Sequence, residues 1–258
     1  MMHMPNAAPP ITWFDFTTKP SEDERARIGL LVLESDQTME SEIRQLTDAL
    51  GVSIYHARLA NDALVTPDTL AKMEAELPVA AALLPEFLGI GALGYGCTSG
   101  ATIIGEKRVA EILKQSHPNV PSSNPLSAAK AALNALGVQS LGLLTPYTPS
   151  VTAAMQARFE AAGIAISVVG SFYEESDIVV GQIDPESILK ATIALGKSDA
   201  CDGIFISCTS LRAAGIIDAA EAQLGKPVTS SNHALAWHLL RLAGINDKLF
   251  GCGRLFDL

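Results

Sequence analysis

Two cysteines occupy the same short motif at distant places in the chain. Cys97 lies in IGALGYGCTSGATIIG at 90–105, and Cys208 lies in DGIFISCTSLRAAGII at 202–217. In each motif Cys-Thr-Ser follows an apolar run and precedes a predicted helix. A thiol at a helix N-terminus faces the positive end of the helix dipole. The dipole stabilises the thiolate and so lowers the pKa of the thiol from its usual value of about 8.5. Such thiols can act as acid and base, or as nucleophile and acid.

One Cys-Thr-Ser alone would be interpreted as a small buried hydrophobe beside an ordinary helix cap. Its repetition at matched positions favours catalysis by Cys97 and Cys208. Cys201 and Cys252 lack the flanking pattern, and we expect them to be structural. We expect all four cysteines to be free thiols, since none belongs to a C-x-x-C pair and a chain of 258 residues folds without disulfides.

Two further matches show that the whole chain repeats. The strand–helix–strand pattern that begins at Arg27 returns from Gln139, and the Ser-Ser-Asn before a helix at 122–124 returns at 230–232. Strands that alternate with helices predict parallel sheets covered by helices. The sequence therefore predicts an α/β fold of two similar domains related by a pseudo-two-fold axis.

The predicted first domain comprises residues 1–122, with an N-terminal arm, together with 232–258, whose helix returns to it. The predicted second domain comprises 123–231. Parallel α/β sheets bind ligands beyond the carboxyl ends of their strands, where both Cys-Thr-Ser motifs lie. We therefore expect the active site in the cleft between the domains.

Composition and charge limit the classes of partner. A net charge of −10 disfavours nucleic acid, and no apolar stretch is long enough for a membrane span. No signal peptide is evident, so we expect a cytoplasmic protein. The apolar cluster Trp13, Phe14 and Phe16 predicts that the arm at 1–26 lies on its own domain or on a neighbouring subunit of a homo-oligomer. No metal-ligand spacing, G-x-G-x-x-G or P-loop is present, so we expect no cofactor.

From about Arg27 to its end, the chain resembles the aspartate/glutamate racemase superfamily, in the branch that contains maleate cis–trans isomerase and arylmalonate decarboxylase. The motifs that carry the resemblance are YGCTSG at 95–100, LLTPYT at 143–148, ISCTSLR at 206–212, SSNHALAWHLLRLAG at 230–244 and GCGRLF at 251–256.

The resemblance implies that two domains close on a substrate and that Cys97 and Cys208 are the catalytic pair. Arylmalonate decarboxylases resemble this chain but carry Gly at the first position, so Cys97 counts against decarboxylation. The resemblance also implies a set of residues that bind a substrate carboxylate through hydroxyl groups or adjacent backbone donors: Thr98, Ser99, Tyr147, Thr209 and Ser210.

Two acidic residues depart from the maleate isomerase pattern, which has Asn where this chain has Asp36 and Asp177. Amino-acid racemases of the superfamily, and members linked to ectoine utilisation, resemble this chain in the acid at the end of the first strand. Both acids are predicted to contact the substrate and to favour a nitrogen-bearing group. We hold His233 as a possible substrate contact and expect His238 to be structural.

The leading hypothesis is therefore a cofactor-independent racemase or isomerase in which two cysteines act on a small carboxylate, amino-acid-like or related to ectoine. One alternative is maleate-type cis–trans isomerisation through a thiolate nucleophile. An alternative of another class is a metabolite-binding protein without turnover.

Overall fold

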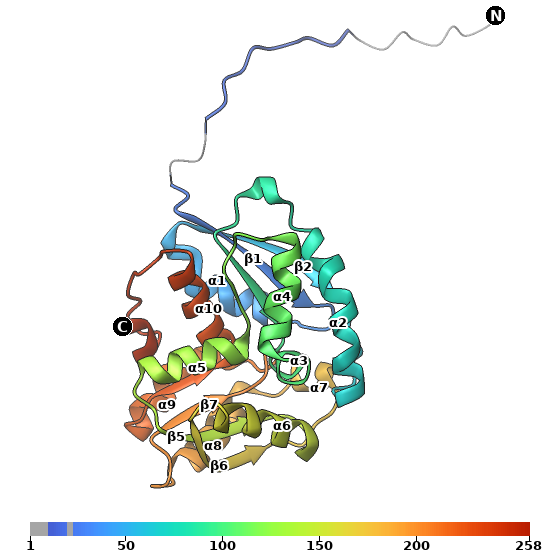
Figure 1. Cartoon of the computed structure of the whole chain (residues 1–258). Coiled ribbons are helices and arrows are strands. Elements are labelled where there is room, and N and C mark those ends of the chain that lie inside the picture. The colour runs from blue at the N-terminus through green and yellow to red at the C-terminus, as the bar shows by residue number, and fades with distance from the viewer. Residues whose placement is uncertain (1–9, 20–22) are drawn as a thin grey trace, which may run out of the picture.

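Two parallel sheets form the centre of the computed structural model, which describes residues 10–19 and 23–258 (Figure 1). The strand order is β2-β1-β3-β4 in one four-stranded sheet and β6-β5-β7-β8 in the other. The strands are β1 (Ala26–Leu33), β2 (Val52–Leu59), β3 (Ala92–Gly96), β4 (Ser122–Ser123), β5 (Ser140–Thr145), β6 (Ala165–Ser171), β7 (Gly203–Ile206) and β8 (Val228–Ser230). The matching orders confirm the predicted fold of two similar α/β halves.

The repeated sequence has a repeated packing role inside the sheets. In β1, residues 28–33 are all buried, as expected for a strand covered on both faces. Gly29 and its counterpart Gly142 in β5 lie under close-packed side chains. A Cβ at Gly29 would come within 2.9 Å of Ile90, and one at Gly142 would collide with Ile204. Both positions therefore require glycine for close packing.

Ten α-helices and four 3-10 helices are present in the described residues. The α-helices are α1 (Met39–Thr47), α2 (Pro67–Ala82), α3 (Thr98–Ile104), α4 (Glu106–Ser116), α5 (Pro125–Ala135), α6 (Pro149–Glu160), α7 (Asp177–Val180), α8 (Pro185–Gly196), α9 (Ile217–Leu224) and α10 (Ser231–Leu242). The 3-10 helices are η1 (Asp48–Leu50), η2 (Glu86–Leu88), η3 (Ala214–Ile216) and η4 (Arg254–Asp257). No helix of the described chain is long and apolar enough to cross a membrane.

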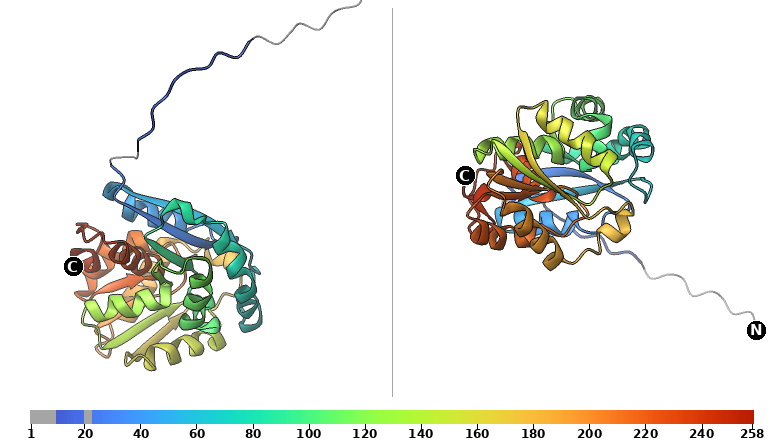
Figure 2. Two further views of the ribbon diagram at one scale, coloured as in Figure 1. Left: turned by 45° about the horizontal axis from the view of Figure 1, so that its top comes forward. Right: turned by 90° about the horizontal axis from the view of Figure 1, so that it is seen from below.

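The two Ser-Ser-Asn segments each supply a helix cap. The Asn124 side chain accepts hydrogen bonds from two backbone amides at the start of α5, and Ser230 accepts one from His233 N in α10. Helix α10 packs against α1, α5 and β3 (Figure 2). Its Leu235 and Leu239 share a core cluster with Leu30 of β1. The last helix thus lies on the first sheet.

The domain division 1–122 plus 232–258, and 123–231, remains a proposal. The first sheet extends one residue beyond the predicted boundary, since Ser123 pairs with Gly94. Helix α5 contributes to both core clusters: Ala128 belongs to the cluster that holds Leu30, whereas Leu133 belongs to the larger cluster, which contains residues of both sheets.

Only part of the arm at 1–26 can be described, because residues 1–9 and 20–22 lie outside the described residues. Residues 10–19 form no helix or strand and extend away from the two halves (Figure 1). Trp13, Phe14 and Phe16 are 88%, 82% and 86% exposed, so they do not pack on the chain's own domain.

Candidate active site

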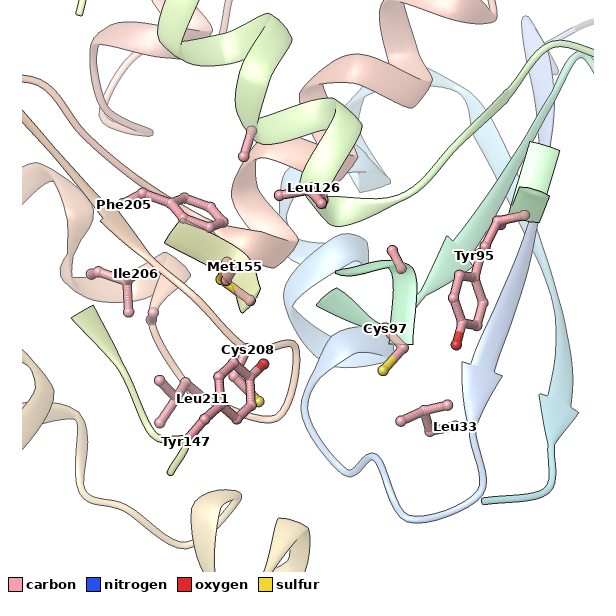
Figure 3. Close-up of a cluster of buried hydrophobic side chains, with 14 of the residues drawn as sticks. Leu33, Tyr95, Cys97, Leu126, Tyr147, Met155, Phe205, Ile206, Cys208 and Leu211 are labelled. Atoms are coloured by element: carbon pink, nitrogen blue, oxygen red, sulfur yellow. The ribbon is translucent and has the colours of Figure 1, made fainter. Parts of the chain in front are cut away.

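A small cavity between the two halves brings both catalytic candidates together. Cys97 follows β3 in the first half and Cys208 follows β7 in the second, and Figure 3 shows them on opposite sides of the space between the halves. The cavity is lined by Leu33, Asn61, Asp62, Leu64, Val65, Thr69, Leu70, Met73, Cys97, Thr98, Ser99, Tyr147, Asp177, Cys208 and Thr209.

Cys97 is the N-cap residue of α3, and its sulfur has two polar neighbours. Gly100 N donates to Cys97 Sγ at 3.2 Å, and Ser99 Oγ lies 3.5 Å from the same sulfur. A Cβ at position 100 would collide with the Tyr95 hydroxyl, which explains the second glycine of YGCTSG, Gly100. Both neighbours would stabilise a negative charge on Cys97.

Cys208 has a different backbone environment from the predicted one. The sequence predicted a helix directly after it, but residues 209–213 form no helix and η3 begins only at Ala214. The prediction was wrong: the chain turns after β7, and Cys208 has a φ of 116°, in the left-handed region that L-residues rarely adopt. Cys208 N instead donates to Ser231 Oγ at 2.9 Å, and that hydroxyl lies 2.8 Å from Thr98 Oγ1. Ser231 thus links the two cysteine loops.

Burial reverses the expected direction of the thiol pKa. Desolvation raises the pKa of Cys97 to about 11, although Ser99 and Gly100 lower it in part. Desolvation raises the pKa of Cys208 further still. Desolvation therefore outweighs the stabilising effect of the helix dipole that the sequence suggested, because both sulfurs are buried. Cys97 is the more readily ionised of the two.

Hydroxyl groups surround the pair. Thr98, Ser99, Tyr147 and Thr209 all line the cavity, as the family resemblance implied. The Tyr147 hydroxyl lies beside the Cys208 sulfur in Figure 3, and its pKa is raised well above its usual value by burial and then by the charge of Cys208. Tyr147 is therefore a neutral donor near the second thiol.

The two candidate acids occupy different places. Asp177 lines the cavity, and Ser210, which does not line it, donates to Asp177 Oδ1 at 2.8 Å. Asp36 also lies outside the lining: its Oδ1 accepts from Thr38 N and Met39 N, both at 2.8 Å, and so caps the start of α1. Burial raises the pKa of Asp36 to about 6, and its Oδ2 has no hydrogen-bond partner in the described part of the chain.

Neither histidine reaches the cavity. His233 is buried between Thr229 Oγ1 at 2.9 Å and Cys252 O at 2.6 Å, and it packs against Phe256. His238 Nδ1 lies 2.8 Å from Ser123 Oγ. Among residues 10–19 and 23–258, no group of three or more His, Cys, Asp or Glu could hold a metal ion.

Sequence reasoning missed part of the lining. Asn61 was visible only as a polar residue after a strand end. Ser231, which lies behind the lining and bonds to Cys208 N, was visible only as a member of the repeated Ser-Ser-Asn. The apolar wall formed by Leu64, Val65 and Met73 had no recognisable signal, because such residues are equally expected in an ordinary helix and its flank.

The cavity is closed in this conformation. Its volume is about 10 Å³, which is the room that one water molecule needs. Two backbone hydrogen bonds join the halves beside it: Val65 N donates to Glu175 O and Asp177 N donates to Ala63 O, both at 2.9 Å. A carboxylate substrate needs more room than this, so we expect the two segments that these bonds join to separate when it enters.

Known proteins resemble the chain over most of its length. The profile of the family described as arylmalonate decarboxylase matches residues 104–256. The maleate isomerase of Nocardia farcinica is 29% identical over 89% of this chain and 94% of its own. The maleate isomerase of Alcaligenes faecalis is 24% identical over 90% of this chain and 96% of its own.

One solved structure is a Cys→Ser variant of the Nocardia farcinica maleate cis–trans isomerase with a covalently bound succinylcysteine intermediate. It is 26% identical and has a TM-score of 0.82, and the match covers 90% of this chain and 98% of that one.

Proposed function

This isomerase belongs to the arylmalonate decarboxylase family, in the branch of the aspartate/glutamate racemase superfamily that contains maleate isomerase and arylmalonate decarboxylase, and we propose that it interconverts the cis and trans forms of a small unsaturated carboxylate. The observation that carries the proposal is the pair Cys97 and Cys208, which come from different halves and line one cavity. Decarboxylases of the family have Gly at the first position, so the retained thiol supports an isomerase.

In the proposed reaction Cys97 is the nucleophile. Its thiolate adds to one carbon of the cis double bond, and the electron pair moves to the neighbouring carbon, which the substrate carboxylate stabilises as an enolate. Cys208 gives that carbon its proton, which leaves a saturated thioether and a Cys208 thiolate. After rotation about the new single bond, Cys208 takes a proton back and the carbon–sulfur bond breaks. The trans acid and the Cys97 thiolate are released.

The surroundings of the two thiols support this division of roles. The Gly100 amide and the Ser99 hydroxyl stabilise negative charge on Cys97, while the higher pKa of Cys208 suits a proton donor. A related isomerase with a succinylcysteine bound to a Cys→Ser variant supports a covalent route in that protein. We propose that Thr98, Tyr147 and Thr209 hold the substrate carboxylate.

Racemisation of an amino-acid-like or ectoine-related compound is the second candidate. The same two thiols could exchange a proton on opposite faces of one carbon, and Asp177 in the cavity would accept bonds from an amino group. The sequence favoured this reaction. We now place isomerisation first, because curated relatives that align with nine-tenths of the chain are maleate isomerases. The same relatives count against a binding protein without turnover.

Proton NMR in deuterium oxide tests both candidates. A cis-butenoic acid derivative should give the signal of its trans isomer, whereas a racemase would remove the α-proton signal of an amino acid. Cys97→Ser should abolish turnover and adduct formation, and Cys208→Ser should abolish turnover but retain one substrate mass on the peptide that carries Cys97. Normal activity in both variants would overturn the proposal.

We further propose a homo-oligomer that works in the cytoplasm without a cofactor. The exposed arm at 10–19 supports contact with a second copy. Free thiols at all four cysteines suit a reducing compartment.

A further inference from the structure

Asp177 places a carboxylate inside the cavity that holds both thiols. The residue begins α7, is 5% exposed, and lines the same cavity as Cys97 and Cys208. Burial is the main cause of the raised pKa of both thiols, and the charge of Asp177 adds to it in each case. A substrate between the sulfurs therefore lies within electrostatic reach of this side chain.

The hydrogen bonds around Asp177 require it to be an acceptor. Ser35 Oγ donates to Asp177 Oδ2 at 2.5 Å and Ser210 Oγ donates to Oδ1 at 2.8 Å. Asn61 Nδ2 donates to Ser35 Oγ at 2.9 Å, while Asn61 Oδ1 accepts from Ser35 N at 3.1 Å, which fixes the orientation of the amide. Since Ser35 Oγ accepts from Asn61, its single proton is directed to Asp177. Each oxygen of Asp177 thus already accepts one hydrogen bond from a serine hydroxyl.

Asp177 forms no ion pair with a basic side chain of the described residues. The described residues that line the cavity include no Lys, Arg or His. The lining contains one further carboxylate besides Asp177, that of Asp62, which is exposed to solvent. A second substrate carboxylate would therefore meet the Asp177 carboxylate without a basic side chain among the described residues that line the cavity. Each Asp177 oxygen can still accept one more hydrogen bond.

We propose that Asp177 selects an unsaturated monocarboxylate whose far end bears a nitrogen donor, a carboxamide or an ammonium group, over the corresponding dicarboxylate. The inference rests on the proposed cis–trans isomerisation. The hydroxyls of Thr98 and Tyr147 take the carboxylate end, and Asp177 accepts from the nitrogen end. Like charges placed together at a desolvated site are strongly disfavoured. The preference should be at least about a hundred-fold in kcat/KM.

Substrate competition between maleate and its half-amide, maleamate, tests the proposal, with cis-4-aminobut-2-enoate as the ammonium arm. The wild type should prefer one of the nitrogen compounds, and which one distinguishes amide from ammonium. Asp177→Asn replaces an acceptor by a donor at constant size, and should shift the maleate/maleamate ratio of kcat/KM about a hundred-fold towards maleate. Glu42→Gln is the matched control, because Glu42 is another buried carboxylate between the halves but does not line the cavity.

The outcomes separate the two proposals. A wild type that turns over maleate at least as well as both nitrogen compounds overturns the role of Asp177, even if the variant does not fold. Equal loss of activity on all three substrates in Asp177→Asn would show a structural role only and would also overturn it. If no compound is isomerised and no adduct forms on Cys97, the proposed function itself fails.

Discussion

Cys208 carries a backbone conformation that L-residues rarely adopt. Its φ of 116° sets the turn after β7, so that Cys208 N reaches Ser231 and the sulfur reaches the cavity. Non-glycine residues at such angles cost about 1–3 kcal/mol and are retained where function requires the side chain. The thiol at this position is therefore maintained at the expense of stability.

Substitution of Cys208 should reveal this strain. At an ordinary buried position Gly is less stable than Ala by about 0.5–1 kcal/mol. Here Cys208→Gly should be at least as stable as Cys208→Ala, because glycine adopts the positive φ without cost. Urea unfolding of the two variants measures the difference. A glycine variant less stable than the alanine variant by the ordinary amount would show that the turn stores no strain.

The raised pKa of Cys97 predicts how its reactivity depends on pH. The neutral thiol is the stable form below a pKa of about 11, so the thiolate fraction rises with pH throughout the neutral and mildly alkaline range. Alkylation of Cys97 by iodoacetamide should rise about tenfold per pH unit from about pH 7 to about pH 9.5. Mass spectrometry of the peptide that carries Cys97 gives the rates. A plateau near the ordinary thiol pKa of about 8.5 would contradict the desolvated environment.

At the scale of elements, two connecting segments close the site. Residues 60–66, between β2 and α2, and residues 172–176, between β6 and α7, meet in a single antiparallel bridge between Leu64 and Ser176. We expect substrate entry to separate them, because the cavity has a volume of only about 10 Å³ and these segments close one side of it. Two backbone hydrogen bonds at the edge of the structure are easily broken compared with a sheet core.

Hydrogen exchange should show this opening. Without ligand, the Val65 and Asp177 amides should exchange much faster than amides of β1 and β5, and a bound substrate analogue should slow them. Exchange mass spectrometry of peptides that cover 60–66 and 172–178 provides the measurement, with peptides from β1 as the internal reference. Protection equal to that of β1 in the free protein would indicate another route into the cavity.

In the whole molecule, the arm at 10–19 exposes several large apolar side chains to solvent. Ile11, Trp13, Phe14 and Phe16 are between 78% and 88% exposed, an unusual concentration of large apolar groups on a surface segment. Burial against a second copy would remove these groups from water. The arm is therefore the segment on which the proposed homo-oligomer depends.

Deletion of residues 1–18 tests this role. The truncated chain should elute at the monomer position in size-exclusion chromatography with light scattering, whereas the full chain should elute as an oligomer. The conformation of the two halves should be retained, so far-ultraviolet circular dichroism per residue should be nearly unchanged. Identical molar masses of both proteins would show that the arm does not join copies.

Local pattern and repetition in the sequence were enough to predict several features of this protein. Apolar strands that alternate with helices, in a pattern that occurs twice, predicted two similar α/β halves with parallel sheets. The repeated Cys-Thr-Ser placed Cys97 and Cys208 at the carboxyl ends of equivalent strands, where ligands bind in such folds. The motifs around them also identified the family, and with it the isomerase chemistry.

Other features depend on how the two halves pack against each other, and these could be established only from the folded chain. Asp36 and Asp177 are equivalent candidates in the sequence, yet Asp36 caps α1 while Asp177 faces the thiols. The direction of the Cys97 pKa shift reversed because the folded chain buries the sulfur, and burial is an effect of distant residues that no local motif encodes. Ser231 joined the site because its hydroxyl lies between two loops that are far apart along the chain. Burial and contacts across an interface depend on distant residues, so they follow from the closed arrangement and not from the spacing of a motif.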